Sequence, residues 1–124
     1  MRWAVAALAA LLAAVGPGAA AEPSLAGMFA SQIMQCWNPP ANAPHPERLV
    51  VSFRIGLTED GAIAQPPQLS ARPDMPANDP YVLGAIEAAR RAIYTCAPYK
   101  LPRERYGEWR DITINFDPRM AMGQ

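Results

Sequence analysis

The sequence predicts an α+β domain in which two helices cover one face of a three-stranded antiparallel sheet. Residues 25–37 and 80–96 carry apolar side chains at spacings of three and four, the period of a helix with one buried face. Residues 49–57, 62–71 and 111–117 alternate apolar and polar side chains, the period of a half-buried strand. The order is therefore α-β-β-α-β, and a sheet with one apolar face gives both helices a surface to cover.

Residues 1–21 have the pattern of a secretory signal peptide. Arg2 supplies a positive start, an uncharged apolar run follows, and the small residues Ala19 and Ala21 suit the positions before a cleavage site. We expect cleavage after Ala21, which leaves a single domain at residues 22–124. The alternative is an uncleaved anchor, but the apolar run is short against the roughly 20 residues that a membrane-spanning helix needs.

The charge balance argues against a nucleic acid or an anionic membrane as partner, because both require a basic face. The chain has 11 Lys and Arg against 11 Asp and Glu, and removal of Arg2 with the signal leaves a net charge of minus one. The basic residues that could gather into a patch are Arg90, Arg91, Lys100, Arg103, Arg105 and Arg110. Acidic residues are interleaved with them at Glu104, Glu108 and Asp111, so we expect a mixed, solvated surface and no stable membrane span after signal cleavage.

The first helix is expected to run from Leu25 to near Trp37. Ser24 can accept a hydrogen bond from a free N–H of its first turn, and the Asn-Pro-Pro at residues 38–40 ends it. The sole histidine, His45, follows in a proline-rich loop. We expect it to be solvated rather than a ligand or a base, because no cluster of Cys, Asp or Glu accompanies it.

The strand at residues 49–57 and the return segment at residues 62–71 form a predicted hairpin, joined by the turn residues Asp60 and Gly61. Prolines at residues 66–67 remove two backbone donors from the return strand. That strand should therefore be unpaired along one edge or broken there, and it belongs at the margin of the sheet.

The second helix has signals at both ends. Asp79 can cap its first turn, Pro80 suits the first helical position, and Pro98 cannot continue it, which predicts a helix of about 17 residues. The strand at residues 111–117 follows, and the tail beyond it has no periodicity and is expected to fray.

Each helix carries one cysteine on its apolar side, Cys36 on the first and Cys96 on the second. A disulfide between the helices is the expected role, and closing a loop of about 60 residues would add about 4 kcal/mol by the chain-entropy estimate. A reactive thiol is the alternative, but neither a C-x-x-C spacing nor a nearby basic residue favours one.

Catalysis and cofactor binding are not expected. General acid-base work needs paired titratable groups in a pocket, and nucleophilic catalysis needs Ser or Cys beside a base, whereas the carboxylates here lie mostly at turns, caps and strand ends. No glycine-rich phosphate loop is present. Four aromatic residues could line a ligand groove, but we expect them to cap the core: Trp37, Tyr99, Tyr106 and Trp109.

A set of motifs spans nearly all of residues 22–124. It comprises Cys36-Trp37-Asn38-Pro39-Pro40, the strand and turn at residues 50–61, Asp79-Pro80, Arg91-Ala92-Ile93-Tyr94-Thr95-Cys96, Pro98-Tyr99, Leu101-Pro102, Tyr106, Trp109 and residues 111–118. In this order and at this spacing the motifs resemble the C-terminal domain of TolA, in the TonB/TolA C-terminal superfamily of Gram-negative cell-envelope proteins.

The resemblance implies a periplasmic protein-binding domain whose exposed sheet edge accepts a partner strand. The implied partners are TolB-like or Pal-like envelope proteins, and toxin or phage proteins that exploit the same route. If the last strand pairs with the first, it forms an open margin of the sheet. The residues that would bind the partner are then Asp111, Ile112, Thr113, Ile114, Asn115, Phe116 and Asp117.

The chain departs from TolA in lacking its membrane-spanning helix and its long helical segment, so we do not expect it to transduce force by itself. It could be a soluble paralogue, a competitor, or a domain with a different binding function. An unrelated periplasmic inhibitor or envelope scaffold on the same fold is the main alternative. The sequence leaves the oligomeric state and the identity of the free edge open.

Overall fold

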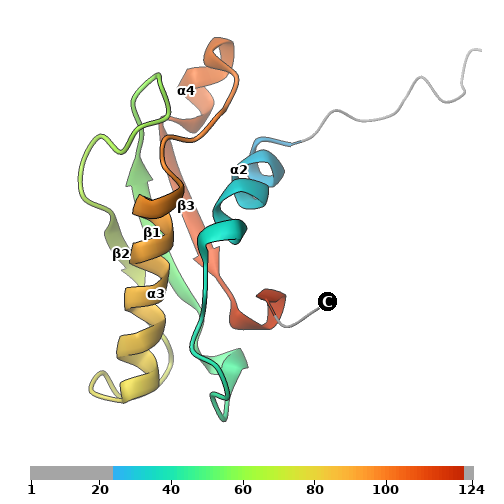
Figure 1. Cartoon of the computed structure of the whole chain (residues 1–124). Helices are drawn as coiled ribbons and strands as arrows, with labels where there is room; N and C mark the ends of the chain where they lie inside the picture. The colour runs from blue at the N-terminus through green and yellow to red at the C-terminus, as the bar shows by residue number, and fades with distance from the viewer. Residues whose placement is uncertain (1–23, 122–124) are drawn as a thin grey trace, which may run out of the picture.

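The structure is a computed structural model that describes residues 24–121, so the signal peptide predicted at residues 1–21 lies outside the described residues. It contains a three-stranded antiparallel sheet in the order β2-β1-β3, with helices on one side (Figure 1). The main elements are α2 (Leu25–Ile33), β1 (Val51–Gly56), β2 (Gln68–Ala71), α3 (Pro80–Cys96), α4 (Tyr106–Trp109) and β3 (Asp111–Phe116). The predicted α+β class and strand order are confirmed.

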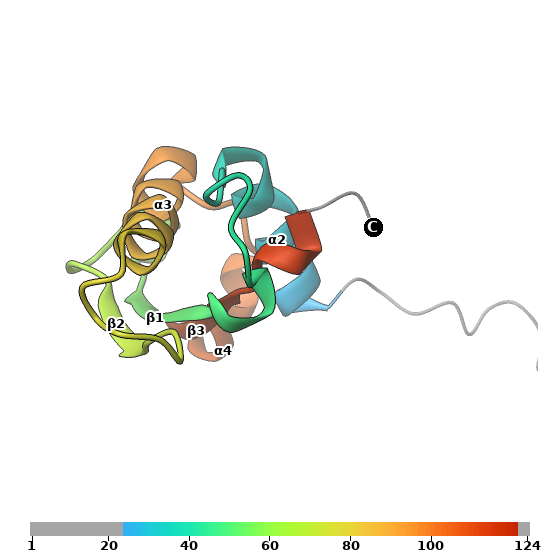
Figure 2. The ribbon, with the colours of Figure 1, turned by 90° about the horizontal axis from the view of Figure 1, so that it is seen from below.

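The two long helices divide the sheet between them. Seen along the domain, α3 lies over the β1 and β2 side, whereas α2 lies on the β3 side (Figures 1 and 2). The core fills the space between the layers, and its centre is fully buried at Ile33, Phe53, Ile55, Ala89 and Ile93. The apolar stripes of both helices and of β1 therefore converge on a single core.

The first helix ends earlier than its apolar pattern predicts. Its start is as expected, because Ser24 Oγ accepts a hydrogen bond of 2.9 Å from the Gly27 amide. The α-helix stops at Ile33, and one 3₁₀ turn, η3 (Met34–Cys36), precedes an extended Trp37. Trp37 is buried against Phe116, with ring centroids 5.4 Å apart, so the chain leaves the helix to place this ring in the core.

The hairpin is interrupted where the prolines stand. Leu57 pairs with Ile63 as an isolated bridge, and regular pairing resumes only at β2, so the continuous return strand drawn over residues 62–71 is too long. The turn itself requires a glycine, because Gly61 has φ +82° and its carbonyl accepts a 2.8 Å hydrogen bond from the Tyr99 amide.

The second helix has the predicted bounds. Asp79 Oδ1 accepts a 2.8 Å hydrogen bond from the Tyr81 amide, and α3 runs for 17 residues to Cys96. Cys96 is half-buried and bonded to Cys36, with Cα atoms 5.9 Å apart. This disulfide joins the last turn of α3 to the turn that follows α2.

The last strand and the tail also differ from expectation. β3 ends at Phe116, and the chain turns directly into η6 (Pro118–Ala121), a 3₁₀ turn, where the sequence predicted a frayed tail. Residues 122–124 lie outside the described part of the chain.

Replacing both cysteines by serine should lower the free energy of unfolding by about 4 kcal/mol, because the 60-residue separation is no longer closed in the unfolded chain. Urea denaturation with and without a reducing agent measures this. Reduction should shift the wild-type midpoint and leave that of the variant unchanged. Equal midpoints for wild type and variant under oxidising conditions would contradict the prediction.

Gly61→Ala should lower the free energy of unfolding by about 2 kcal/mol or more, since its Cβ would lie 1.8 Å from the Tyr99 carbonyl oxygen at a positive φ. Gly107→Ala is the matched control. Its Cβ meets nothing within 4 Å, so its effect should stay within about 0.5 kcal/mol. The prediction fails if the two variants unfold at the same urea concentration.

Candidate protein-docking edge

The free edge of β3 presents an open row of backbone hydrogen-bonding groups. Val51 to Gly56 of β1 pair in unbroken register with Phe116 to Asp111 of β3, and the Leu57 amide donates to the Arg110 carbonyl at 2.8 Å. This bond fixes the alternation of the antiparallel ladder, so that even-numbered β3 residues bond to β1. The N–H and C=O groups of Asp111, Thr113 and Asn115 therefore point outward, and no other backbone segment within residues 24–121 bonds to them.

The opposite edge of the sheet is poorly suited to docking. β2 has only four residues, follows Pro66 and Pro67, and loses regular register between Ser52 and Phe53 of β1. Short edge strands, prolines and irregular pairing are the usual means of blocking strand addition. Of the two margins, β3 is thus the one that offers a regular strand of six residues.

The two faces of β3 differ in polarity. Ile112 and Ile114 point to the helical side but remain half-buried, although they pack on the core, and only Phe116 of that face is fully buried. On the outer face Asp111, Thr113 and Asn115 are exposed. A strand added here would meet apolar side chains on its helical side and polar ones on the other.

Ser52 and Asn115 tie the outer face of β3 to β1. The Ser52 hydroxyl donates a hydrogen bond to Asn115 Oδ1, and Ser52 is the one buried polar residue of the described chain, 7% exposed. The bond uses the side chain of Asn115 and leaves its outward backbone groups free. It holds the last third of β3 in register without covering the edge.

The helix on the β3 side, α2, has an unusual composition for a surface helix. None of its nine residues is charged, yet only Phe29 and Ile33 are buried. Surface helices ordinarily carry a charged or polar outer face, so α2 exposes an uncharged surface on the same side as the open edge. Figure 2 shows this helix beyond the β3 margin rather than over the centre of the sheet.

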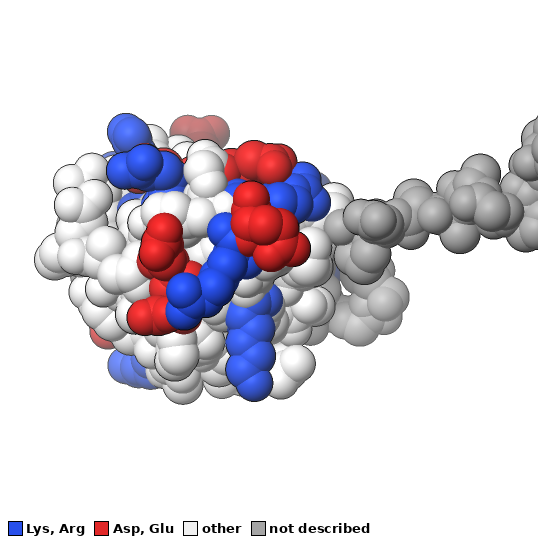
Figure 3. Space-filling view, turned by 90° about the horizontal axis from the view of Figure 1, so that it is seen from above, with Lys and Arg blue, Asp and Glu red and all other residues white. Residues whose placement is uncertain are grey.

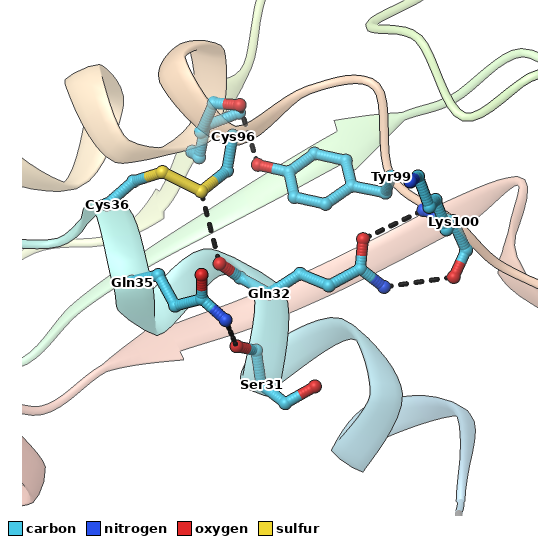
Figure 4. Close-up of a disulfide and its surroundings, with 8 residues drawn as sticks. Ser31, Gln32, Gln35, Cys36, Cys96, Tyr99 and Lys100 are labelled. Carbon is cyan, nitrogen blue, oxygen red and sulfur yellow. Dashed lines mark hydrogen bonds between the residues drawn. A yellow bond between two sulfur atoms is a disulfide. The ribbon is translucent and has the colours of Figure 1, made fainter.

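Two links hold α2 in this position. One is the Cys36–Cys96 disulfide at its C-terminal end. The other is the side-chain amide of Gln32, which donates to the Lys100 carbonyl at 2.9 Å and accepts from the Lys100 amide at 2.8 Å (Figure 4). This amide pairs with the backbone as a neighbouring strand would, so it fixes α2 against the loop that follows α3.

Asp117 does not belong to the strand, which corrects its assignment to the docking residues. Its carboxylate accepts hydrogen bonds from the Arg119 amide at 3.0 Å and the Arg119 guanidinium at 2.6 Å, and so caps η6. The side-chain bond from Arg119 lowers the pKa of Asp117 below its ordinary value of 3.8. The alternation of the sequence continues through Asp117 because Pro118 comes only at the next position.

The remaining candidate residues lie away from the edge. His45 is exposed beside Glu47, with 3.5 Å between Nδ1 and Oε2, in the 3₁₀ turn region before β1. Within residues 24–121 no group of three or more His, Cys, Asp or Glu is placed to hold a metal ion. Nor does that part of the chain contain a helix long and apolar enough to cross a membrane.

The aromatic and basic clusters have structural explanations. Trp37, Tyr99 and Trp109 are buried, and burial raises the pKa of the Tyr99 phenol, whose hydroxyl donates to the Ile93 carbonyl at 2.6 Å. The fourth ring, Tyr106, packs at the margin of the core. Figure 3 shows basic and acidic side chains interleaved over the α4 end, where Arg105 pairs with Glu108 at 2.8 Å and Arg103 pairs with Asp60.

One hollow was not expected from the sequence. It has a volume of about 360 Å³ and lies between Trp37, the loop at residues 38–43, Pro46 and Pro118. No charged residue lines it. Only the cluster of prolines on either side of residues 41–45 could have signalled it.

Comparisons with known proteins give one likeness of fold. No protein-family model matches the chain, and no curated protein matches its sequence. Among solved structures, the chain is similar to a solution NMR structure of TolAIII bound to a peptide derived from the N-terminus of TolB. The two are 24% identical, the match covers 85% of this chain and 82% of that one, and the TM-score is 0.48.

Asp117→Asn should lower the free energy of unfolding at neutral pH by up to about 1 kcal/mol, the range of a partly exposed ion pair. Because the folded state lowers the pKa of Asp117, its stabilising effect is present above the ordinary value of 3.8 and disappears as the pH falls through the lowered pKa. Urea midpoints of wild type and variant should therefore converge in acid.

The control is the double variant Asp117→Asn with Arg119→Gln, which should lose little more than either single variant. A stability difference that persisted undiminished below the lowered pKa would show that the carboxylate charge is not responsible.

Proposed function

We propose that this chain is a periplasmic protein-binding domain that accepts an extended strand of a partner protein along the β3 edge. The observation that supports this proposal is the open row of N–H and C=O groups on Asp111, Thr113 and Asn115, on a regular strand that the described chain leaves unpaired. Strand addition takes its affinity from such main-chain groups and its selectivity from alternating side chains.

The polarity of β3 defines the chemistry of the partner strand. Side chains that point to the helical side would cover Ile112 and Ile114, and so should be apolar, β-branched or aromatic. Side chains on the other side would lie beside exposed Thr113 and the Arg54 guanidinium, which is opposite Thr113 on β1, and so should be polar or acidic. We therefore expect an alternating strand of about five residues.

The resemblance of the sequence to the TolA C-terminal domain suggests which proteins carry this strand. The candidates are TolB-like and Pal-like envelope proteins, with toxin or phage proteins as invaders of the same edge. Export by the signal peptide at residues 1–21 would bring the domain to the periplasm, where these proteins occur. A peptide from the N-terminus of TolB is a defined first probe.

Thr113→Pro should weaken binding of a partner strand about tenfold or more. It removes an outward donor and places the proline ring where the partner backbone would lie, while the β1–β3 ladder does not use this N–H. The control is Thr113→Val, which keeps the amide and a β-branched side chain. Both variants can be compared by NMR titration with the TolB peptide and by pull-down from periplasmic extract.

Ile114→Pro is not a suitable test, because the Ile114 amide belongs to the ladder with Phe53 and its loss should unfold the domain. The proposal would be wrong if folded Thr113→Pro protein captured the same partners as Thr113→Val. Folding of each variant is checked by the dispersion of its amide NMR spectrum.

A further inference from the structure

The outward row of β3 is complementary to itself. In an antiparallel pair of two copies centred on Thr113, each outward residue faces an outward residue of the second copy: Asp111 faces Asn115, and Thr113 faces Thr113. The N–H and C=O groups of all three residues are then satisfied. No like charges stand opposite one another within β3.

Shifted registers are poorer. A two-fold axis at Asp111 opposes two aspartates, and an axis at Ile114 opposes Asp111 to Asp117 of the second copy. An axis at Ile112 leaves the outward groups of Asn115 unused, and one at Asn115 leaves those of Asp111 unused. The register centred on Thr113 is therefore the one that pairs the whole row without opposing charges.

The helical side of the strand fits the same register. Ile112 of each copy would face Ile114 of the other as a non-hydrogen-bonded pair, in which side chains approach most closely. Both residues are half-buried in the single chain, so the pairing would cover the apolar surface that they leave exposed. The two copies of α2 would lie on the same side of the joined sheet, and α2 brings no charged residue to that side.

We propose that two copies of this chain associate through their β3 edges, antiparallel and centred on Thr113, to form a continuous six-stranded sheet that hides the docking edge. The contact is small, so we expect it to be weak, with a dissociation constant of about 100 µM or higher. Its effect on partner binding rests on the proposed function, whereas the pairing of two copies does not.

The test is sedimentation velocity of the purified chain over a concentration series up to about 1 mM, several-fold above the expected dissociation constant. Wild type should shift from monomer to dimer. Thr113→Lys should remain monomeric, because the two lysines would face each other and each would lie beside the Arg54 guanidinium on β1. Thr113 is exposed, so the substitution should leave the fold intact.

Thr113→Asp provides the matched rescue. Alone it should dimerise less than wild type, and mixed with Thr113→Lys it should form a heterodimer, since opposite charges then meet at the axis. Dimers that persist unchanged in Thr113→Lys, a mixture that fails to associate, or a monomeric wild type at 1 mM would each overturn the inference.

Failure of this inference and failure of the proposed function give different results. Titration of the TolB peptide at a protein concentration well below the dissociation constant measures strand docking alone. If the inference holds, the apparent affinity for the peptide should fall as the wild-type concentration rises through that constant, and the fall should be absent in Thr113→Lys. A peptide affinity independent of wild-type concentration would mean that self-association does not hide the edge.

Discussion

A three-stranded sheet necessarily has two strands with one unpaired edge each, and the structure depends on how each edge is managed. β1 occupies the centre and is hydrogen-bonded on both sides, with the side chains of Val51, Phe53 and Ile55 buried under the helices. β2 is short, irregular and preceded by two prolines, which blocks its edge. β3 has none of these features, so the exposed main-chain groups of the domain are concentrated on one strand.

The helical layer is what makes one edge different from the other. α3 has explicit caps, carries charges on its outer face and covers the β1 and β2 side, whereas α2 is short, uncharged and only partly buried. A helix of nine residues with two buried side chains has little hold on the core by itself. The disulfide and the Gln32 amide supply that hold, and they keep an apolar surface beside β3 without closing its edge.

The elements that the sequence predicts well are those with local signals at both ends. Asp79, Pro80 and Pro98 bound α3, and the Asp60-Gly61 turn with Pro66 and Pro67 defines the hairpin and its break. The end of α2 was misplaced because burial of Trp37 against Phe116, a contact distant in sequence, overrides the helical period. Asp117 was misplaced because its alternation is indistinguishable from that of a strand until its bonds to Arg119 are known. Which β3 residues point outward depends on the side of the strand on which β1 lies, and this is a property of the tertiary fold alone.

The polarity of β3 determines what a partner strand must offer in order to displace a second copy of the chain. The self-pairing places threonine opposite threonine and aspartate opposite asparagine on its outer face, and these pairs contribute little beyond their backbone bonds. A partner strand with larger apolar side chains over Ile112 and Ile114 would use the same main-chain groups and bury more surface against the uncharged α2. Because self-association depends on the concentration of the chain and partner binding on that of the partner, a weak dimer would protect the edge from unspecific strands and still yield to a specific one.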